Sequence, residues 1–136
     1  MKLEKIQYST LNAKQKEAYN FQKLSGILAD YGFVTIRLSN DWQSADFIAQ
    51  HIDGTRFLKV QLKGRLYFSK AYEGKDIYVA FPDGGAWYLY PHDEALSLIL
   101  NKTNIASTRS WMEGGVYHFP EISVDIRAIM EDYRIR

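Results

Sequence analysis

Three polar side chains of complementary chemical types lie on two neighbouring apolar runs of the chain. Asp46 opens the first run, and Gln61 and Lys63 end the second. Between the runs lies Asp53-Gly54, a dipeptide typical of two-residue hairpin loops. With this dipeptide at the centre of the turn, cross-strand partners have numbers that sum to 107, so Asp46 faces Gln61 with Cβ atoms roughly 5 Å apart.

The two sides of this predicted hairpin differ sharply in polarity. Side chains alternate along a strand with period 2, so Gln61 and Lys63 point to the same side of the sheet as Asp46. The opposite side is apolar and carries Ala45, Phe47, Ala49, Leu58, Val60 and Leu62. A carboxylate, an amide oxygen and an ammonium group therefore converge on one patch, which is the set of groups that metal-assisted attack on a phosphodiester requires.

The same residues resemble the signature of the PD-(D/E)XK nuclease superfamily. In that signature an acid opens one strand, and an acid or Gln, any residue and Lys follow on the next. This chain reads Ser44-Ala45-Asp46-Phe47-Ile48 and Leu58-Lys59-Val60-Gln61-Leu62-Lys63-Gly64-Arg65, and the match covers about residues 12 to 90. Ala45 replaces a proline and Gln61 replaces the second acid, and the latter change resembles the Mrr-like restriction branch.

The resemblance implies both a fold and an activity. The implied fold is α/β, a restriction-endonuclease-like core with a mixed β-sheet of about five strands and flanking helices. The implied activity is that of a Mg²⁺- or Mn²⁺-dependent endonuclease acting on DNA. The implied metal ligands are Asp46, Gln61, the backbone carbonyl of Leu62, and Glu17. Lys63 would orient or help to deprotonate the attacking water, or stabilise charge on the scissile phosphate.

A first helix is expected to bring Glu17 to this site. Asn12 followed by Gln15 predicts a capped helix start, and Gly32 predicts its end. Between them an apolar stripe at helical spacing comprises Ala18, Phe21, Leu24, Ile27, Leu28 and Tyr31. Glu17 continues this stripe, and in the superfamily an acid on the first helix often completes the metal site. Alternatively, Glu17 stabilises the first helical turn or pairs with a neighbouring lysine.

The rest of the pattern predicts strands and helices that alternate in one domain spanning residues 1-136. Strands are expected at 33–38, 45–51, 57–63, 77–81 and 86–90, and a second helix at 91–101. A short run at 116–119 and an amphipathic segment at 124–133 follow. His51 falls on the core face and is interpreted as structural, and His92 as part of the capping of the second helix. Asp41-Trp42 precede the site and either contact substrate or, in the case of Trp42, pack under the sheet.

Charge is unevenly distributed along the chain. The net charge is only +1, but the segment 56–75 carries six basic residues against Glu73 alone. Aromatic residues interleave with them, namely Phe57, Tyr67, Phe68 and Tyr72. This mixture suits phosphate neutralisation and base stacking, although a solvated strand edge is the alternative. The residues that we expect to contact DNA are Arg65, Lys59, Lys70 and Tyr67.

Composition excludes several classes and leaves two rivals open. With no cysteine, disulfides, thiolate zinc sites and cysteine nucleophiles are excluded. No apolar run is long enough for a membrane span and no secretory signal is visible, so we expect a cytoplasmic protein without membrane contact. One rival is a catalytically inactive nuclease fold that only binds nucleic acid. The other is a protein-interaction or regulatory module whose interface contains Trp87, Tyr88, Tyr90 and Trp111. Sequence-selective cutting would require a homodimer or a partner.

Overall fold

A computed structural model describes residues 1–42 and 44–136 of the chain, without the side chains of residues 40–42. The role expected of Asp41-Trp42 therefore lies outside the described side chains. The helices are α1 (Ala13–Ala29), α2 (His92–Lys102), α3 (Arg109–Gly114) and α4 (Val124–Met130), with 3₁₀ turns η1 (Tyr8–Thr10), η2 (Lys70–Tyr72), η3 (Ile105–Ser107) and η4 (Glu131–Tyr133). The strands are β1 (Phe33–Trp42), β2 (Ala45–His51), β3 (Phe57–Leu62), β4 (Tyr67–Ser69), β5 (Ile77–Asp83), β6 (Ala86–Pro91) and β7 (Val116–His118).

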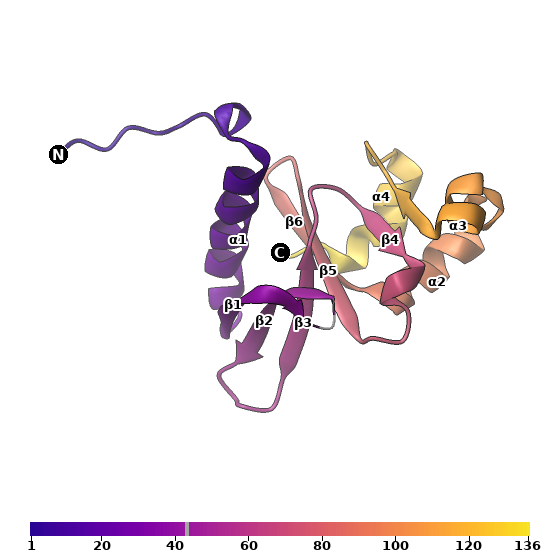
Figure 1. Cartoon of the computed structure of the whole chain (residues 1–136), viewed down its shortest axis with the longest axis horizontal. Coiled ribbons are helices and arrows are strands. Elements are labelled where there is room, and N and C mark those ends of the chain that lie inside the picture. Colours follow the sequence, from indigo (N-terminus) through magenta and orange to yellow (C-terminus); the bar gives the residue numbers. More distant parts are fainter. Residues whose placement is uncertain (43) are drawn as a thin grey trace.

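A five-stranded sheet forms the middle layer, with the strand order β1-β2-β3-β5-β6. The pairs β1–β2, β2–β3 and β5–β6 are antiparallel, whereas β3 and β5 are parallel. Figure 1 shows α1 on one side of this sheet and α2, α3 and α4 on the other, together with β4, which pairs with β7 in a small second sheet. The predicted fold class, α/β with a mixed sheet of five strands and flanking helices, is confirmed.

The hairpin of β2 and β3 has the predicted register. Phe47 pairs with Val60 and Gln50 with Phe57, as numbers summing to 107 require. The loop itself is longer than the predicted two residues, because the last backbone bond runs from His51 N–H to the Arg56 carbonyl. Both loops share the same centre, so the register is unaffected.

α1 forms as predicted and covers one face of the sheet. Asn12 Oδ1 accepts from Gln15 N–H at 2.8 Å and Gln15 Oε1 accepts from Asn12 N–H at 3.0 Å, a complete capping box. The helix ends at Ala29, and Gly32 follows with a φ of 85°. The core on this face consists of Leu24, Leu28, Phe47, Ala49, Val60, Ala80 and Trp87.

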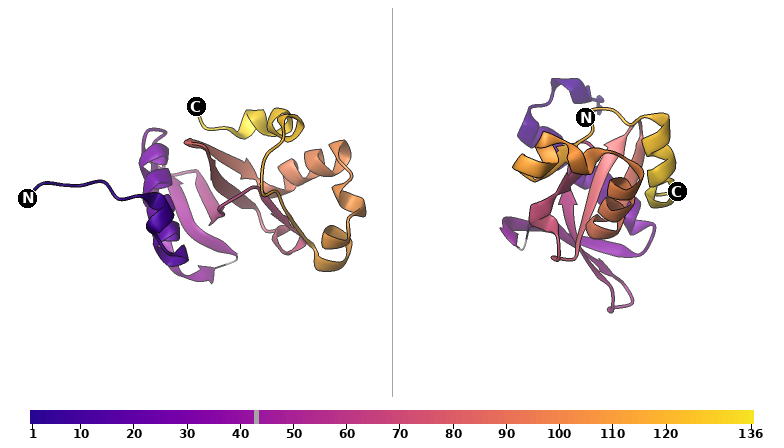
Figure 2. Two further views of the ribbon diagram at one scale, coloured as in Figure 1. Left: turned by 90° about the horizontal axis from the view of Figure 1, so that it is seen from above. Right: turned by 90° about the vertical axis from the view of Figure 1, so that its right-hand side faces the viewer.

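A second, aromatic core lies on the other face of the sheet, beneath α2 and α4, and Figure 2 shows these helices on that side. Its largest members include Phe68, Tyr72, Phe81, Tyr88, Tyr90 and Trp111. The prediction that Phe68 and Tyr72 are available for base stacking is therefore wrong, since both are buried. Trp87, Tyr88, Tyr90 and Trp111 are also buried, so they provide no interface of the kind that an interaction module would need.

Several local predictions need correction. β1 is longer than predicted, and β4 and α3 occupy segments that were expected to be irregular. His92 does not cap α2, since its ring is buried and Nε2 accepts from the Ser69 N–H at 3.0 Å. His51 is structural as expected but belongs to the hairpin end, where Nδ1 accepts from Asp53 N–H. Within residues 1–42 and 44–136, no helix combines the length and the apolar character that crossing a membrane requires.

Candidate functional site

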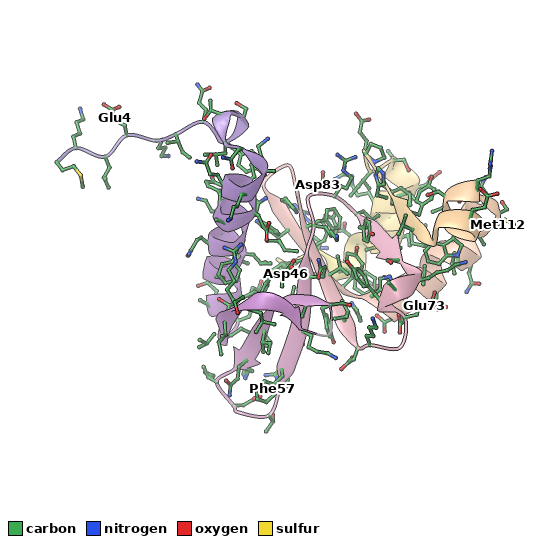
Figure 3. All side chains as sticks on the ribbon, viewed as in Figure 1. Glu4, Asp46, Phe57, Glu73, Asp83 and Met112 are labelled. Atoms are coloured by element: carbon green, nitrogen blue, oxygen red, sulfur yellow. The ribbon has the colours of Figure 1, made fainter. Side chains whose placement is uncertain are left out.

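The predicted site lies at the end of the sheet where β2 begins and β3 ends. Figure 3 labels Asp46, which lies near the centre of the view. On β1 to β3 the face away from α1 is partly uncovered, since Val34 is 59% exposed, Ile36 51% and Phe57 57%. Ser44, two residues before Asp46, has a φ of 68°, an unusual value for a residue other than glycine. Asp46 therefore closely follows a backbone conformation that residues with a side chain rarely adopt.

Asp46 is anchored to the partner strand through its side chain. Its Oδ2 accepts a hydrogen bond from the Leu62 N–H at 2.8 Å. The regular ladder reaches Phe47 and Val60, and one residue beyond it the Asp46 carboxylate takes the place of a backbone acceptor. This bond fixes the carboxylate beside the Gln61-Leu62-Lys63 segment, as the sequence predicted.

Gln61 contributes an oxygen that the protein itself does not satisfy. Its Oε1 is buried and has no hydrogen-bond partner among the residues that the structure describes. Leaving a buried acceptor unpaired costs about 1–3 kcal/mol, so such an oxygen is usually matched by an ordered water or an ion. Mg²⁺ and Mn²⁺ prefer oxygen donors, and a carboxylate beside a neutral amide oxygen fits either ion.

The donor set at this site contains few charges. In the described part of the chain, no group of three or more His, Cys, Asp or Glu residues could hold a metal ion. Mg²⁺ usually keeps several waters and binds one or two carboxylates plus substrate phosphate. The residues present therefore fit an ion that is held jointly by the protein and a phosphate group.

Lys63 is held in place from both ends. Its backbone N–H donates to the Ala80 carbonyl at 2.9 Å, and its Nζ lies 4.3 Å from the centroid of the Tyr67 ring. Tyr67 is itself fixed, because its N–H and carbonyl both bond to the hydroxyl of Tyr90. Tyr90 is fully buried, and this burial raises the pKa of its phenol. The ammonium of Lys63 thus lies against a fixed aromatic ring.

Glu17, on α1, lines a depression that Asp46 also lines. An open depression of about 440 Å³ is lined by Glu17 together with Arg37, Leu38, Ser39 and Asp46. Glu17 Oε1 lies 3.3 Å from Arg37 Nη2, and both side chains are about half exposed. Of the predicted alternatives, ion pairing is therefore observed, but the partner is an arginine and not a lysine.

Arg37 was missed by sequence reasoning. It pairs with Phe47 in the β1–β2 ladder, and its guanidinium lies 5.3 Å from the ring centroid of Phe21. This places a cation in the depression that Glu17 and Asp46 share. Predicting the position of Arg37 requires the register of β1 against β2. The sequence does not give this register, because the segment between the two strands has no turn signature of defined length.

The residues expected to contact DNA surround the site unevenly. Lys59 lies on β3 two residues before Gln61 and on the same side of the strand. Arg65 is exposed, with Nη1 3.4 Å from His118 Nδ1. Lys70 lies further along the chain, where its Nζ is 5.3 Å from the Trp111 ring centroid, so it belongs to the surface beside α3. Lys59, Arg65 and Tyr67 are thus the members of the set nearest to Lys63 in the sequence.

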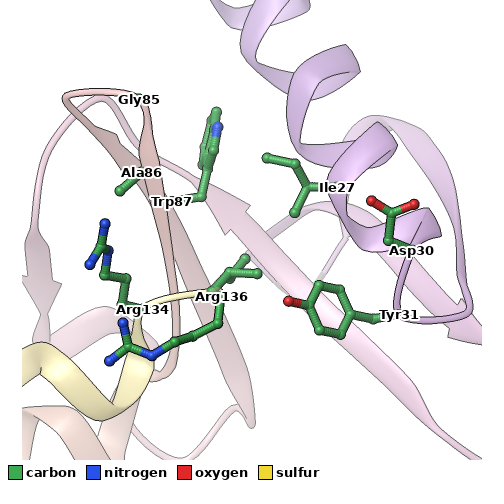
Figure 4. Close-up of a pocket in the computed structure, with 9 residues that line it drawn as sticks. Ile27, Asp30, Tyr31, Gly85, Ala86, Trp87, Arg134 and Arg136 are labelled. Carbon is green, nitrogen blue, oxygen red and sulfur yellow. The ribbon is translucent and has the colours of Figure 1, made fainter.

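A larger depression lies elsewhere. It measures about 650 Å³ and lies between the C-terminal end of α1, the β5–β6 turn and the C-terminal residues (Figure 4). Figure 4 shows Arg134 and Arg136 on one side and Tyr31 with Asp30 on the other. Arg136 is paired with Glu131, and none of the predicted site residues lines this space.

No family model matches the chain, and no curated protein matches it either. Among solved structures, the chain is similar to Archaeoglobus fulgidus Hjc, a Holliday junction resolvase from an archaeal hyperthermophile. The alignment covers 57% of this chain and 74% of the resolvase, with 22% sequence identity and a TM-score of 0.46. At this level of similarity, the function of the chain has to be inferred from its own residues.

Proposed function

We propose that the chain is a metal-dependent nuclease that hydrolyses phosphodiester bonds in DNA. Two observations carry the proposal: Oε1 of Gln61 is buried and unpaired among the described residues, and the carboxylate of Asp46 is anchored to the backbone of the next residue, Leu62. A glutamine kept only for structure would bond through this oxygen, because an unpaired buried acceptor destabilises the fold. A cation that arrives with a phosphate substrate accounts for both groups.

Each residue of the site has a distinct role in this proposal. Asp46 and Gln61 hold the ion, and the backbone carbonyl of Leu62 and the carboxylate of Glu17 complete the protein ligands. When bound, the ion supplies Lewis-acid stabilisation and lowers the pKa of a coordinated water. Lys63, resting on Tyr67, is the cation of the chain that orients the attacking water or offsets charge on the scissile phosphate.

Contacts outside the site would hold the substrate. Arg65 and Lys59 neutralise flanking phosphates, with Tyr67 and Lys70 further along the same basic segment. A homodimer, which would present one site to each strand of a duplex, stays a prediction. Because the protein supplies so few anions, we expect weak metal binding in the free protein and tighter binding once DNA is present.

One rival function is favoured by a specific observation. Gln61 in place of an acid leaves Asp46 and Glu17 as the acids that line the depression, and Glu17 is already paired with Arg37. A nuclease fold that had lost its metal site and retained DNA binding would look similar. In that case DNA would bind without being cut, and Lys63 substitutions would change affinity alone.

Incubation of the protein with a panel of DNA substrates separates these functions. The panel comprises linear duplex, single-stranded, branched and plasmid DNA, each with Mg²⁺, Mn²⁺ or EDTA. The nuclease yields products with metal and none with EDTA. Absence of products in every condition, together with gel retardation that fades as salt is added, would instead establish binding alone. If the protein neither cuts nor retards DNA, both functions are rejected.

A further inference from the structure

A third depression lies at the end of the sheet where the candidate site is found, between α1 and the β5–β6 turn. It measures about 610 Å³, and its lining includes Tyr8, Tyr19, Lys23 and Gly64. Figure 1 shows the N-terminal part of α1 and the β5–β6 turn at the same end of the molecule. Gly64 directly follows Lys63, so the Cα atoms of these two residues are about 3.8 Å apart. The depression, here called the α1 groove, therefore adjoins the backbone just beyond the end of β3, on the side of the sheet that α1 covers.

Two tyrosine rings are fixed along the α1 groove. The ring centroids of Tyr8 and Tyr19 lie 5.2 Å apart, with an interplanar angle of 57°. Asn20, which is 8% exposed, donates from Nδ2 to the Tyr8 hydroxyl at 2.9 Å and holds that ring against the helix. Tyr8 nevertheless stays 40% exposed, so part of its surface remains available to a ligand.

Each of these rings has a lysine beside it. Lys16 Nζ is 5.3 Å from the Tyr8 ring centroid, and Lys23 Nζ is 5.4 Å from that of Tyr19. The whole segment 1–29 is basic, with five lysines against Glu4 and Glu17. Positive charge thus follows the aromatic surface along the helix, although the chain as a whole is almost neutral.

The opposite wall of the α1 groove contains three glycines together with Pro82 and Trp87. A Cβ atom added at Gly64, Gly84 or Gly85 would meet nothing within 4 Å. Gly84 and Gly85 have positive φ values of 57° and 87°, so the turn requires them. Gly64 has no positive φ, so its backbone does not require glycine, and the missing side chain leaves the wall open and the backbone accessible.

We infer that the α1 groove binds a single-stranded segment of the nucleic-acid substrate. Unpaired bases stack on Tyr8 and Tyr19, while Lys16 and Lys23 neutralise the adjacent phosphates. In a duplex the base faces are covered by neighbouring bases, so aromatic side chains can stack only on unpaired ones. Resting on the proposed nuclease function, the inference makes the preferred substrate a single strand, or a duplex with a single-stranded extension next to the scissile phosphate.

Binding to labelled oligonucleotides in EDTA tests this inference without any cleavage. Fluorescence anisotropy compares an oligothymidylate with a duplex of the same length, using the wild type and Tyr19→Ala. We expect Tyr19→Ala to weaken single-strand binding about tenfold, a typical effect of removing one stacked ring, and to leave duplex binding unchanged. The matched control is Tyr31→Ala, because Tyr31 is 45% exposed and lines the 650 Å³ depression but not the α1 groove.

A second variant addresses the charge and leaves the rings in place. Lys23→Ala should reduce the slope of the logarithm of the single-strand binding constant against the logarithm of salt concentration by about 0.7, the loss of one phosphate contact. Thermal unfolding of each variant checks that the fold is intact. Equal weakening on both DNA forms, or no weakening on either, would overturn the inference, as would an unchanged salt slope.

The outcomes for the groove and for the nuclease are separable. If duplex DNA is cleaved in a metal-dependent way but single-strand binding is unaffected by Tyr19→Ala, the inference about the α1 groove is rejected and the nuclease function is supported. Single-strand binding that depends on Tyr19, with no cleavage in any metal, supports the groove and rejects the nuclease. Failure to bind any nucleic acid overturns both.

Discussion

Replacing Gln61 by methionine should make the protein more stable and inactive. Methionine has nearly the same length and no buried oxygen, so the variant removes the acceptor that has no partner within the described residues. The unpaired oxygen costs about 1–3 kcal/mol, and losing whatever contacts the Nε2 group makes costs about 0.5–1.5 kcal/mol. The expected net gain in the free energy of unfolding without metal is therefore about 1 kcal/mol.

Thermal unfolding with and without metal measures this effect. For a chain of this length, 1 kcal/mol corresponds to roughly 4 °C in Tm, so Gln61→Met should melt a few degrees above the wild type in EDTA. With Mg²⁺ at ten times its dissociation constant, binding stabilises the wild type by about 1.4 kcal/mol and leaves the variant unaffected. The difference between the two proteins should thus close or reverse when metal is added.

The matched control is Gln50→Met on the neighbouring strand. Gln50 lies four residues from Asp46 on the same side of β2, roughly 13 Å along the strand, so it should change neither cleavage nor the response to metal. A Gln61→Met protein that is clearly less stable in EDTA would mean that the oxygen has a structural partner. Retention of full cleavage by that variant would equally refute its role as a ligand.

The remaining predictions concern the neighbours of this oxygen. Lys63→Met should keep the packing of this side chain against Tyr67 but lower the rate of single-turnover cleavage roughly 10²–10³-fold. The control Lys75→Met should leave the cleavage rate unchanged. Equal cleavage rates for the two variants would exclude a catalytic role for the Lys63 cation. Glu17→Gln breaks a half-exposed ion pair with Arg37, so the free energy of unfolding should change by less than about 1 kcal/mol. The Mg²⁺ concentration needed for half-maximal cleavage should rise. If that concentration is unchanged, Glu17 is not a metal ligand and only forms the ion pair. The backbone N–H of Thr55 holds the pKa of Asp53 below its ordinary value of 3.8, so Asp53→Ala should lower Tm at neutral pH. That difference should be full above pH 3.8 and shrink as the pH falls towards the lower folded-state pKa, and a difference independent of pH would contradict the shift.

The hairpin and the first helix were predictable because their signals are local. Asp53-Gly54 marks the centre of the turn, and alternation on both sides fixes which residues face Asp46. The capping pair of Asn12 and Gln15 likewise needs only residues three positions apart. These local features place Asp46 beside the segment from Gln61 to Lys63, which is why the candidate site could be located from the sequence.

Features that depend on distant partners could not be predicted. β4 comprises three residues that pair with β7, about fifty positions later, so no local pattern marks it. Phe68 and Tyr72 alternate with basic residues in the sequence, a pattern typical of surface aromatics. Both are nevertheless buried, because they pack in the core beneath α2 and α4. Arg37 enters the site through the β1–β2 register, and the unpaired state of the Gln61 oxygen depends on side-chain packing that no sequence pattern shows.

The most direct test of the central claim is DNA cleavage by Asp46→Asn compared with the wild type, in Mg²⁺ and in Mn²⁺. Asparagine can still accept the Leu62 N–H bond and thus keeps the anchor, but it lacks the negative charge that a cation needs. Asp76→Asn is the matched control, because Asp76 is exposed and has a φ of 56°, which asparagine tolerates. We expect metal-dependent products from the wild type and Asp76→Asn and none from Asp46→Asn. Equal cleavage by all three proteins would contradict a metal site at Asp46.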